Sequence, residues 1–535
     1  MGNSNGRKVL LSSVCQPFGE KYGDGFGTSY EGTHQIMWAQ GLFRTRGTST
    51  QWGIDFIAQN LATPTTTLHY PTMGQFIDEI KRGYDYIGIA FVTATLHKMI
   101  PMVEAIRKHA PASQIVLGGY GTALGEELLA PYADHICRGE GVSYMRELLG
   151  ESLDRTIEQP VIMQRRTLFS LPLLGDLGYI FAGVGCPNGC DFCATSHYYR
   201  RQHIQFLRSG RSILCAIERL REINPKLDLF WINDEDFLLD EERGRGFLEA
   251  IRESDLPAFG ISVFSSVKAL SKYEPSELVE MGIDWVWVGY EAKSAGYAKM
   301  EGKPYQELFA ELHRHGISTL ASMIIGYDYQ TPEIIQQEFE ELMSFRPSMC
   351  QFLIYGPSPD TPLYHRMKDE GRLFPQHIDT YNRHDGFYLQ FEHPHIGAEE
   401  MQAIQRQLYH DEYARLGPTI YRVVEDFFSG YVNLRDHPAE RVRAKAQKYK
   451  RDAHNTLPII LAAKRYLEPQ TGEWLDNLYQ EIIKETGRLN AKERLFEKIA
   501  PAILAMTHLS MRFDIGQQPK FSKRTFPEPV GPWRP

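Results

Sequence analysis

The chain has 535 residues, of which 42% are hydrophobic and 23% are charged, and its formal net charge is −9. This length exceeds one ordinary hydrophobic core and predicts roughly two to four globular domains. The negative balance argues against a function that depends on long-range attraction to nucleic acid. No apolar run is long enough to span a bilayer, and the polar residues 1–7 lack the apolar core of a secretory signal. We therefore expect a cytoplasmic protein without a membrane span.

The first segment alternates apolar strands with amphipathic helices. Strands are predicted at 8–14, 86–92 and 114–117, and helices at 73–82 and 99–109. This alternation predicts an α/β fold with a parallel, doubly wound sheet. Such a sheet binds its ligands at the carboxyl ends of its strands.

A second run of strands follows an irregular stretch at 150–178, where we expect a domain boundary. Amphipathic helices, such as 213–223, 244–252 and 305–315, separate most of these strands. Six repeats of strand and helix predict an open or partial barrel whose chemistry lies just past the strand ends. The six strands are predicted at 179–185, 229–233, 260–264, 285–291, 319–325 and 351–355.

Beyond about residue 397 helical periods replace the strand signals, which predicts a C-terminal helical cap. Its aromatic residues are expected to form its own core, with the roof of a bulky apolar substrate site as the alternative. These residues include Tyr421, Phe427, Phe428, Tyr431 and Tyr449. The last residues are rich in Pro and basic side chains and are predicted to be disordered or draped over the surface. The predicted division of the chain is 1–165, 166–375, 376–515 and 516–535.

Three of the seven cysteines, Cys186, Cys190 and Cys193, lie in one loop directly after a predicted strand. An odd number of cysteines with one bunched group favours a reducing compartment and a metal site over a disulfide framework. Gly185 and Gly189 allow the backbone to wrap around a bulky centre. Three thiolates would leave one iron of a 4Fe–4S cluster open to a substrate's amino and carboxylate groups.

The alternative is a zinc site, for which His197 would supply the fourth ligand. Structural zinc sites usually consist of paired knuckles, and a loop between a strand and a helix at the head of a barrel is not their usual context. We therefore favour iron and sulfur. The scattered Cys15, Cys137, Cys215 and Cys350 are given no chemistry.

The three cysteines match the CxxxCxxC motif of the radical S-adenosylmethionine (SAM) superfamily, and Phe192 is the aromatic residue usual before the third cysteine. The stretch 233–237, Asn-Asp-Glu-Asp-Phe, resembles the acidic turn that contacts the SAM amino group in this family. Glu291 ends the fourth strand, where the family also contacts SAM. The resemblance therefore implies SAM binding by Phe192, Asp234, Glu235 and Glu291, with the choice within 234–236 left open.

Two further segments resemble the cobalamin-dependent members of that superfamily. The stretch 357–364, Pro-Ser-Pro-Asp-Thr-Pro-Leu-Tyr, is similar to the P-x-P-G-T-P-L-Y signature after the sixth strand, with Asp360 in place of the usual Gly. Residues 84–151 resemble the cobalamin-binding domain that precedes the barrel. The implied cobalamin-binding residues are Thr93, Thr95, Gly118, Gly119, Glu140 and Gly141.

A doubly wound domain that has lost its ligand is the alternative for this segment. The D-x-H-x-x-G motif, which supplies a histidine to cobalt in many cobalamin proteins, is missing after the first strand. We therefore expect no cobalt ligand from that motif. His34 and His97 are the remaining candidates, although a lone histidine is more often a structural residue.

The resemblance implies an enzyme whose cluster cleaves SAM reductively to a 5′-deoxyadenosyl radical. Its cofactors would be the 4Fe–4S cluster, SAM and cobalamin, and an electron donor such as a flavodoxin or ferredoxin would be its partner. Methylation of an unactivated carbon on a small-molecule or lipid-like substrate is the leading hypothesis. Ring contraction, cyclisation or another rearrangement without methyl transfer is the first alternative. The second is a zinc-stabilised binding or regulatory protein whose basic helix 441–451 contacts an acidic partner.

Overall fold

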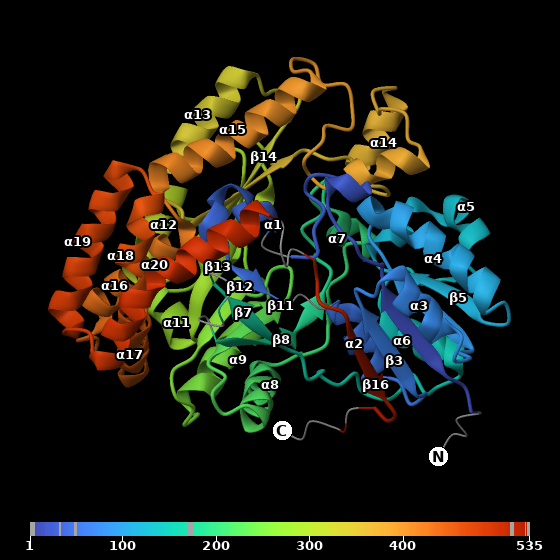
Figure 1. The fold of residues 1–535 in the computed structure, drawn as a ribbon, viewed down its shortest axis with the longest axis horizontal. Coiled ribbons are helices and arrows are strands. Elements are labelled where there is room, and N and C mark those ends of the chain that lie inside the picture. Colours follow the sequence, from blue (N-terminus) through green and yellow to red (C-terminus); the bar gives the residue numbers. More distant parts are fainter. Residues whose placement is uncertain are drawn as a thin grey trace.

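The computed structural model describes residues 6–31, 34–47, 51–168, 171, 175–513, 518–529 and 531. Two β-sheets stand side by side (Figure 1), one built from the amino-terminal part of the chain in blue and cyan, the other from its middle in green and yellow. Red and dark orange helices of the carboxyl-terminal part lie on the side of the second sheet that faces away from the first, and the last of them crosses in front of it. The predicted α/β class is confirmed.

The amino-terminal sheet has the strand order β16-β3-β1-β4-β5-β6, in which β16 alone is antiparallel to its neighbour. Helices α3 and α4 pack on one face, and α2 and α6 pack on the other. The sheet is therefore doubly wound, as predicted. The strands are β1 (Val9–Ser13), β3 (Thr65–His69), β4 (Tyr86–Ala90), β5 (Gln114–Gly118), β6 (His135–Ile136) and β16 (Ser522–Phe526), and the helices are α2 (Trp52–Ala58), α3 (Met73–Ile80), α4 (Leu96–His109), α5 (Glu126–Leu129) and α6 (Gly141–Leu149).

The second sheet has the order β15-β14-β13-β12-β11-β8-β7-β2. Its six parallel strands are the six that the sequence predicts, and their open arrangement is the expected partial barrel. Strands β7 (Met163–Thr167) and β2 (Arg46–Gly47) extend it in antiparallel fashion. The parallel strands are β8 (Asp176–Phe181), β11 (Leu229–Asn233), β12 (Gly260–Phe264), β13 (Ile283–Glu291), β14 (Ser318–Ile325) and β15 (Met349–Ile354).

Helices alternate with these strands because each presents an apolar face to the common core. A two-stranded pair, β9 (Gly183–Val184) and β10 (Ile204–Gln205), brackets the cysteine loop. The helices are α7 (Ala194–Tyr198), α8 (Gly210–Ile223), α9 (Glu241–Arg252), α10 (Val267–Leu270), α11 (Pro275–Glu280), α12 (Tyr305–Arg314), α13 (Pro332–Ser344) and α14 (Pro362–Asp369).

Two of the carboxyl-terminal helices, Thr419–Leu434 and Glu440–His454, pack at the amino ends of the barrel strands. Lys445 Nζ donates to the Gly282 carbonyl (2.9 Å) and to Asp284 (3.1 Å) at the start of β13, and Ser318 at the start of β14 donates to Asp426 (2.8 Å). The cysteine loop follows the opposite ends of the strands. The expected cap is therefore a base, and its aromatic side chains form a core rather than the roof of a site. The helices are α15 (Ala398–Leu416), α16 (Thr419–Leu434), α17 (Glu440–His454), α18 (Leu457–Ala463), α19 (Pro469–Thr486) and α20 (Ala491–Arg512).

The prediction of a disordered tail at 516–535 is wrong for residues 522–526, which form β16. This strand pairs along the whole of β3, and Gln518 exchanges hydrogen bonds with the Phe18 backbone. Side chains of a strand alternate between its two faces. Lys523 accordingly reaches Glu79 on one face (2.7 Å), and Arg524 reaches Asp55 on the other (2.6 Å). The basic residues that suggested disorder are the ones that attach the strand.

A short segment after the first strand crosses from one sheet to the other. Helix α1 (His34–Met37) contacts β15, and β2 joins the edge of the second sheet. Residues 34–47 therefore belong structurally to the barrel, whereas the sequence assigned them to the amino-terminal unit. Within the described residues, no helix combines the length and the apolar character that crossing a membrane requires.

Candidate functional site

The carboxyl ends of the two sheets meet at helix α7, directly after the cysteine loop. Tyr198 on α7 donates from its hydroxyl to the carbonyls of Gly119 (3.3 Å) and Cys137 (3.2 Å), which follow β5 and β6. Two cavities lie at this junction. The larger, of about 530 Å³, lies among the ends of both sheets, and the smaller, of about 220 Å³, lies over the barrel strands beside the cysteines.

The cysteine loop is shaped by close backbone contacts. Gly185 has a φ of 82°, and a Cβ there would lie 2.2 Å from the Gln202 carbonyl oxygen, so only glycine fits. The Ser196 hydroxyl ties the loop together, because it donates to the Cys186 carbonyl (2.7 Å) and accepts from the Gly189 amide (3.1 Å). Cys186, Cys190 and Cys193 all border the smaller cavity, as a shared centre requires.

The thiols are in a desolvated environment. Burial raises the pKa of Cys186 to about 12 and that of Cys190 to about 11, the latter opposed by the charge of Lys299. In the ranges that the structure describes, no three His, Cys, Asp or Glu side chains are grouped so as to hold a single metal ion. A 4Fe–4S cluster takes each thiolate on a different iron, so its ligands need not converge on one point.

His197, the fourth ligand in the zinc alternative, is engaged elsewhere. Its Nε2 lies 3.0 Å from the backbone carbonyl of Cys190. The histidine thereby helps to fold the loop that carries the thiols, which is a structural role. The donor set around the smaller cavity fits a three-thiolate cluster.

The three carboxylates of the acidic turn after β11 have different surroundings. Asp234 is buried and accepts from Arg243 (2.8 Å) and His203 (3.1 Å); burial acts to raise its pKa, but these partners outweigh it and hold the pKa below its usual value. Glu235 and Asp236 line the smaller cavity. Asp236 accepts from the backbone amide of Ser266 (3.0 Å), whereas Glu235 has its pKa raised to about 7 by burial and by the charge of Asp234.

Glu291 also borders the smaller cavity, where it pairs with Lys299. Lys299 is mostly buried, and its pKa is raised above its usual value because the carboxylate of Glu291 outweighs the effect of burial. No sequence pattern pointed to this lysine. It lies eight residues beyond Glu291 in a short 3-10 helix, and no motif distinguishes it from a surface lysine.

Phe192 does not line the smaller cavity and packs instead against other aromatic rings. Its ring contacts those of Tyr297 (5.5 Å between centroids) and Tyr355 (6.0 Å). The hydroxyls of these two tyrosines both donate to Asp191, the residue between Cys190 and Phe192. Phe192 and Asp191 therefore anchor the cysteine loop to the loops after β13 and β15.

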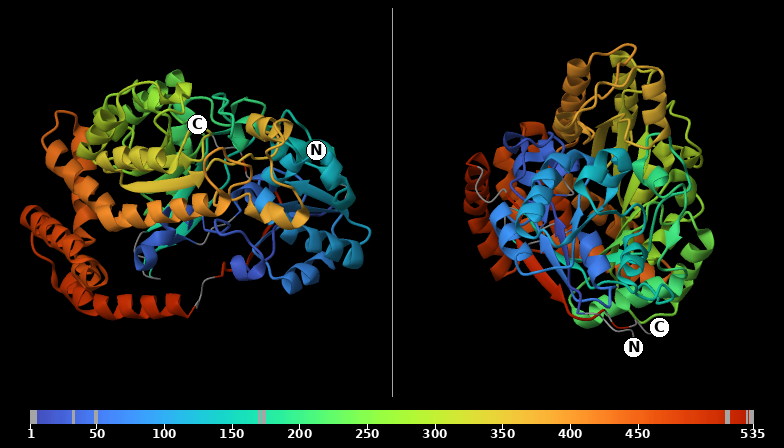
Figure 2. Two further views of the ribbon diagram at one scale, coloured as in Figure 1. Left: turned by 90° about the horizontal axis from the view of Figure 1, so that it is seen from above. Right: turned by 90° about the vertical axis from the view of Figure 1, so that its right-hand side faces the viewer.

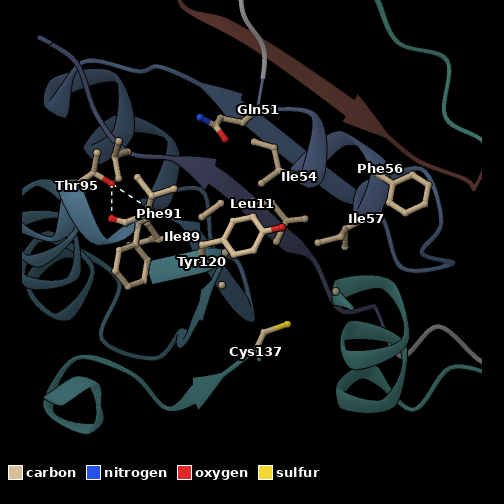
Figure 3. A pocket seen from close by; sticks show the side chains of 18 of the residues that line it. Leu11, Gln51, Ile54, Phe56, Ile57, Ile89, Phe91, Thr95, Tyr120 and Cys137 are labelled. Carbon is tan, nitrogen blue, oxygen red and sulfur yellow. Dashed lines mark hydrogen bonds between the residues drawn. The ribbon is translucent and has the colours of Figure 1, made fainter. Parts of the chain in front are cut away.

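The larger cavity is lined mainly by apolar side chains. Figure 3 shows Leu11 from β1, Ile54 and Ile57 from α2, and Ile89 from β4 converging on it with Tyr120. Of the predicted cobalamin-binding residues, Thr95, Gly118, Gly119, Glu140 and Gly141 line the cavity and Thr93 does not. Cys137, which was given no chemistry, lines it as well.

The predicted polar residues at this cavity have structural roles of their own. The Thr95 hydroxyl exchanges hydrogen bonds with the Val92 backbone (Figure 3), and the Glu140 carboxylate caps helix α6. A Cβ at Gly119 would lie 2.6 Å from the Phe91 carbonyl oxygen, and one at Gly141 would lie 2.6 Å from the Ile57 side chain. These two positions of the cavity wall therefore require glycine, because the neighbouring atoms leave no room for a side chain.

The charge of the larger cavity restricts its ligand. Among the described residues its lining contains no Lys or Arg, so no side-chain cation there would pair with a phosphate group. A large, mostly apolar macrocycle approached by glycine backbone fits the lining, and the strand-end position is where such sheets bind their ligands. The residues present are therefore compatible with a corrin ring.

The two histidines considered as cobalt ligands do not line this cavity. His34 contacts the Phe26 carbonyl (3.2 Å) and Arg44 (3.1 Å), and His97 contacts Asp24 (3.0 Å). Within the described ranges His384 is the histidine in the lining, and it is bound through Nε2 to Gln376 (2.8 Å). Burial lowers the pKa of His384 to about 4, so its ring is neutral at pH 7.

Two tyrosine side chains of the larger cavity lie near a carboxylate of the smaller one. Tyr120 and Tyr199 line the larger one, and burial together with the nearby Glu235 carboxylate of the smaller one raises the pKa of both hydroxyls. Asp360 adds a second link between the sheets. It adopts a φ of 69°, which explains the glycine usual at this position, and its carboxylate pairs with Arg138 after β6.

No family model matches the chain. Bacteriochlorophyllide d C-12(1)-methyltransferase of Chlorobaculum tepidum is 26% identical over 245 residues, which are 43% of this chain and 51% of that protein. The anaerobic magnesium-protoporphyrin IX monomethyl ester cyclase of Rubrivivax gelatinosus is 22% identical over 347 residues, 56% of this chain and 60% of the relative. The matches thus span only about half of these relatives' lengths.

A solved structure shares the fold over most of the chain. The radical SAM methyltransferase TsrM from Kitasatospora setae, with cobalamin and a [4Fe–4S] cluster bound, superposes with a TM-score of 0.53 at 14% identity, covering 84% of this chain and 99% of that one. The fold, the sequence relatives and the cysteine motif of this chain are consistent with one another. The chain is thus similar over part of its length to these two relatives, and it shares the fold of a radical SAM methyltransferase that binds cobalamin and a [4Fe–4S] cluster.

Proposed function

We propose that this protein is a cobalamin-dependent radical SAM methyltransferase. Cys186, Cys190 and Cys193 would hold a 4Fe–4S cluster, SAM would occupy the smaller cavity, and cobalamin would occupy the larger one. The observation that carries the proposal is that Tyr120, which lines the larger cavity, lies beside Thr195 and Glu235, which line the smaller one. When bound, these cofactors supply reductive cleavage of SAM and a transferable methyl group.

The residues of the smaller cavity suit the charged ends of SAM. Glu235 is the best partner for an ammonium group, because a cation beside it would stabilise the carboxylate form that burial disfavours. Lys299 pairs with Glu291 but also lines this cavity, so it would place a positive charge near a carboxylate bound there. Asp234 is committed to Arg243 and orients the turn, so we assign it a positioning role.

The substrate would lie beside the cobalamin, where the apolar side chains of the larger cavity favour a small-molecule or lipid-like compound. Apolar walls disfavour a strongly charged molecule and exclude water from the space near the cysteines. The two relatives are named for tetrapyrroles, which are large and mostly apolar. We extend to this chain only the class, a bulky apolar molecule with an unactivated carbon.

A labelled methyl group tests the proposal. Anaerobically purified protein would be incubated with methyl-deuterated SAM, hydroxocobalamin, a chemical reductant or reduced flavodoxin, and a fractionated lipid extract of the source cells. We expect a product heavier than its precursor by one labelled methyl group. A product without the label would instead support ring closure or rearrangement, which the cyclase relative makes the second candidate. Zinc in place of iron in the purified protein would contradict both.

A further inference from the structure

Helix α20 carries an apolar stripe on its outer face. Five large hydrophobic side chains, on the helix and the residue that follows it, point to solvent and are 46–66% exposed. Their spacing places them on one side of the helix over a length of roughly 27 Å. The other exposed large hydrophobic side chains of the described chain are scattered singly. The five are Leu495, Ile499, Met506, Leu509 and Phe513.

The opposite face of α20 fixes the helix to the protein. Ala500 and Leu504 are fully buried there. Glu497 accepts from the Tyr479 hydroxyl (3.0 Å), and Arg465 donates to the Pro501 carbonyl (2.7 Å). The helix lies along the front of the molecule in Figure 1 and along its lower edge in the left view of Figure 2. The stripe is therefore the outward side of a firmly placed helix.

The charges beside the stripe are basic. Helical spacing puts Lys492 on one side of it and Lys498 on the other, and both are exposed. Arg494 and Arg512 are exposed as well. The acidic residues of the helix lie on the inner face, where Glu493 and Glu497 contact other helices. This distribution contrasts with the net charge of −9 for the whole chain.

We propose that the outer face of α20 docks on an anionic membrane surface. An apolar stripe bordered by lysines is the pattern of helices that lie in the interface of a bilayer, with the apolar side chains in the acyl region and the cations at the headgroups. A protein groove of ordinary composition would not require cations on both borders. The helix would lie on the membrane rather than cross it.

Flotation of the full-length protein with lipid vesicles tests this proposal. Vesicles of equal parts phosphatidylglycerol and phosphatidylcholine are compared with vesicles of phosphatidylcholine alone. We expect the protein to bind the anionic vesicles. Replacing Leu495, Met506 and Leu509 together by Ser should reduce this binding at least about tenfold, because each substitution removes an apolar side chain that the bilayer would bury. The matched control replaces Leu153 and Ile223, which are 56% and 46% exposed elsewhere, by Ser and should not change binding.

Two further variants separate the apolar and ionic contributions. Lys492→Gln with Lys498→Gln should weaken binding to the anionic vesicles and leave the weak binding to phosphatidylcholine unchanged. Phe513→Trp should show a blue-shifted emission that brominated lipids quench. Absence of vesicle binding by the parent protein would overturn the proposal. So would an equal loss of binding in the control, or a stripe-dependent dimer that does not bind vesicles, which would identify a second copy as the occupant.

Discussion

Replacement of Lys299 by Met tests the electrostatics of the smaller cavity. Lys299 pairs with Glu291, whose side chain is only 5% exposed, and the change would leave that carboxylate buried without its cation. Removing one partner of a buried ion pair costs about 3–5 kcal/mol. Lys299 itself is 19% exposed, so we expect the lower end, about 3 kcal/mol. The double variant with Glu291→Gln should lose less than the sum of the two single variants.

Urea unfolding of the cluster-free protein measures this loss, because Trp285 and Trp287 on β13 report on the same strand by fluorescence. Lys303→Met is the matched control, since its pair with Glu311 is about a quarter exposed and should contribute less than about 1 kcal/mol. In the cluster-loaded protein, Lys299→Met should raise the Kd for SAM at least about tenfold. A variant with unchanged stability and unchanged SAM affinity would refute the reasoning.

Three other predictions concern carboxylates and their partners. Glu235→Gln should weaken SAM binding in cluster-replete protein, whereas Asp234→Asn should mainly lower stability; equal SAM affinity in both variants and the parent would contradict this division. Arg524→Met should destabilise the amino-terminal sheet by about 1–2 kcal/mol in urea unfolding, because Arg524 is itself 35% exposed and fully buried Asp55 keeps His69 (2.9 Å) as a partner, while Lys520→Met should change little. Burial raises the pKa of Asp426 from 3.8 to about 7, so the folded state binds more protons in this interval and stability should fall as pH rises through it. Asp426→Asn should reduce that slope, and an unchanged slope would contradict the assignment.

The barrel and the cysteine loop were predictable because their signals are local. Each parallel strand is a short apolar run, and the three cysteines with Gly185 lie within one loop. The doubly wound sheet was recognised from three of its strands. Strand β3 was missed because Thr65, Thr66 and Thr67 are polar, although all three are buried. Periodicity of hydrophobic residues cannot identify a strand whose buried residues are threonines.

The remaining features depend on partners that are distant in the sequence. Arg524 pairs with Asp55, which is 469 residues away in the sequence. Lys445 pairs with Asp284 at the amino end of β13, which is 161 residues away. No local pattern encodes such pairs, so the attached tail and the position of the helical base were not foreseen. The role of Asp234 was not predictable for the same reason. Its ion pair with Arg243 results from the packing of α9 and not from the acidic motif.

Cofactor content of the anaerobically purified protein tests the central claim most directly. We predict iron and sulfide in the amounts of one 4Fe–4S cluster, together with cobalamin retained through gel filtration. Cys186→Ala should lose the cluster and keep cobalamin, because its thiolate borders only the smaller cavity, and Cys215→Ala should keep both. Full iron content in the Cys186 variant, or zinc in place of iron in the parent, would contradict the account.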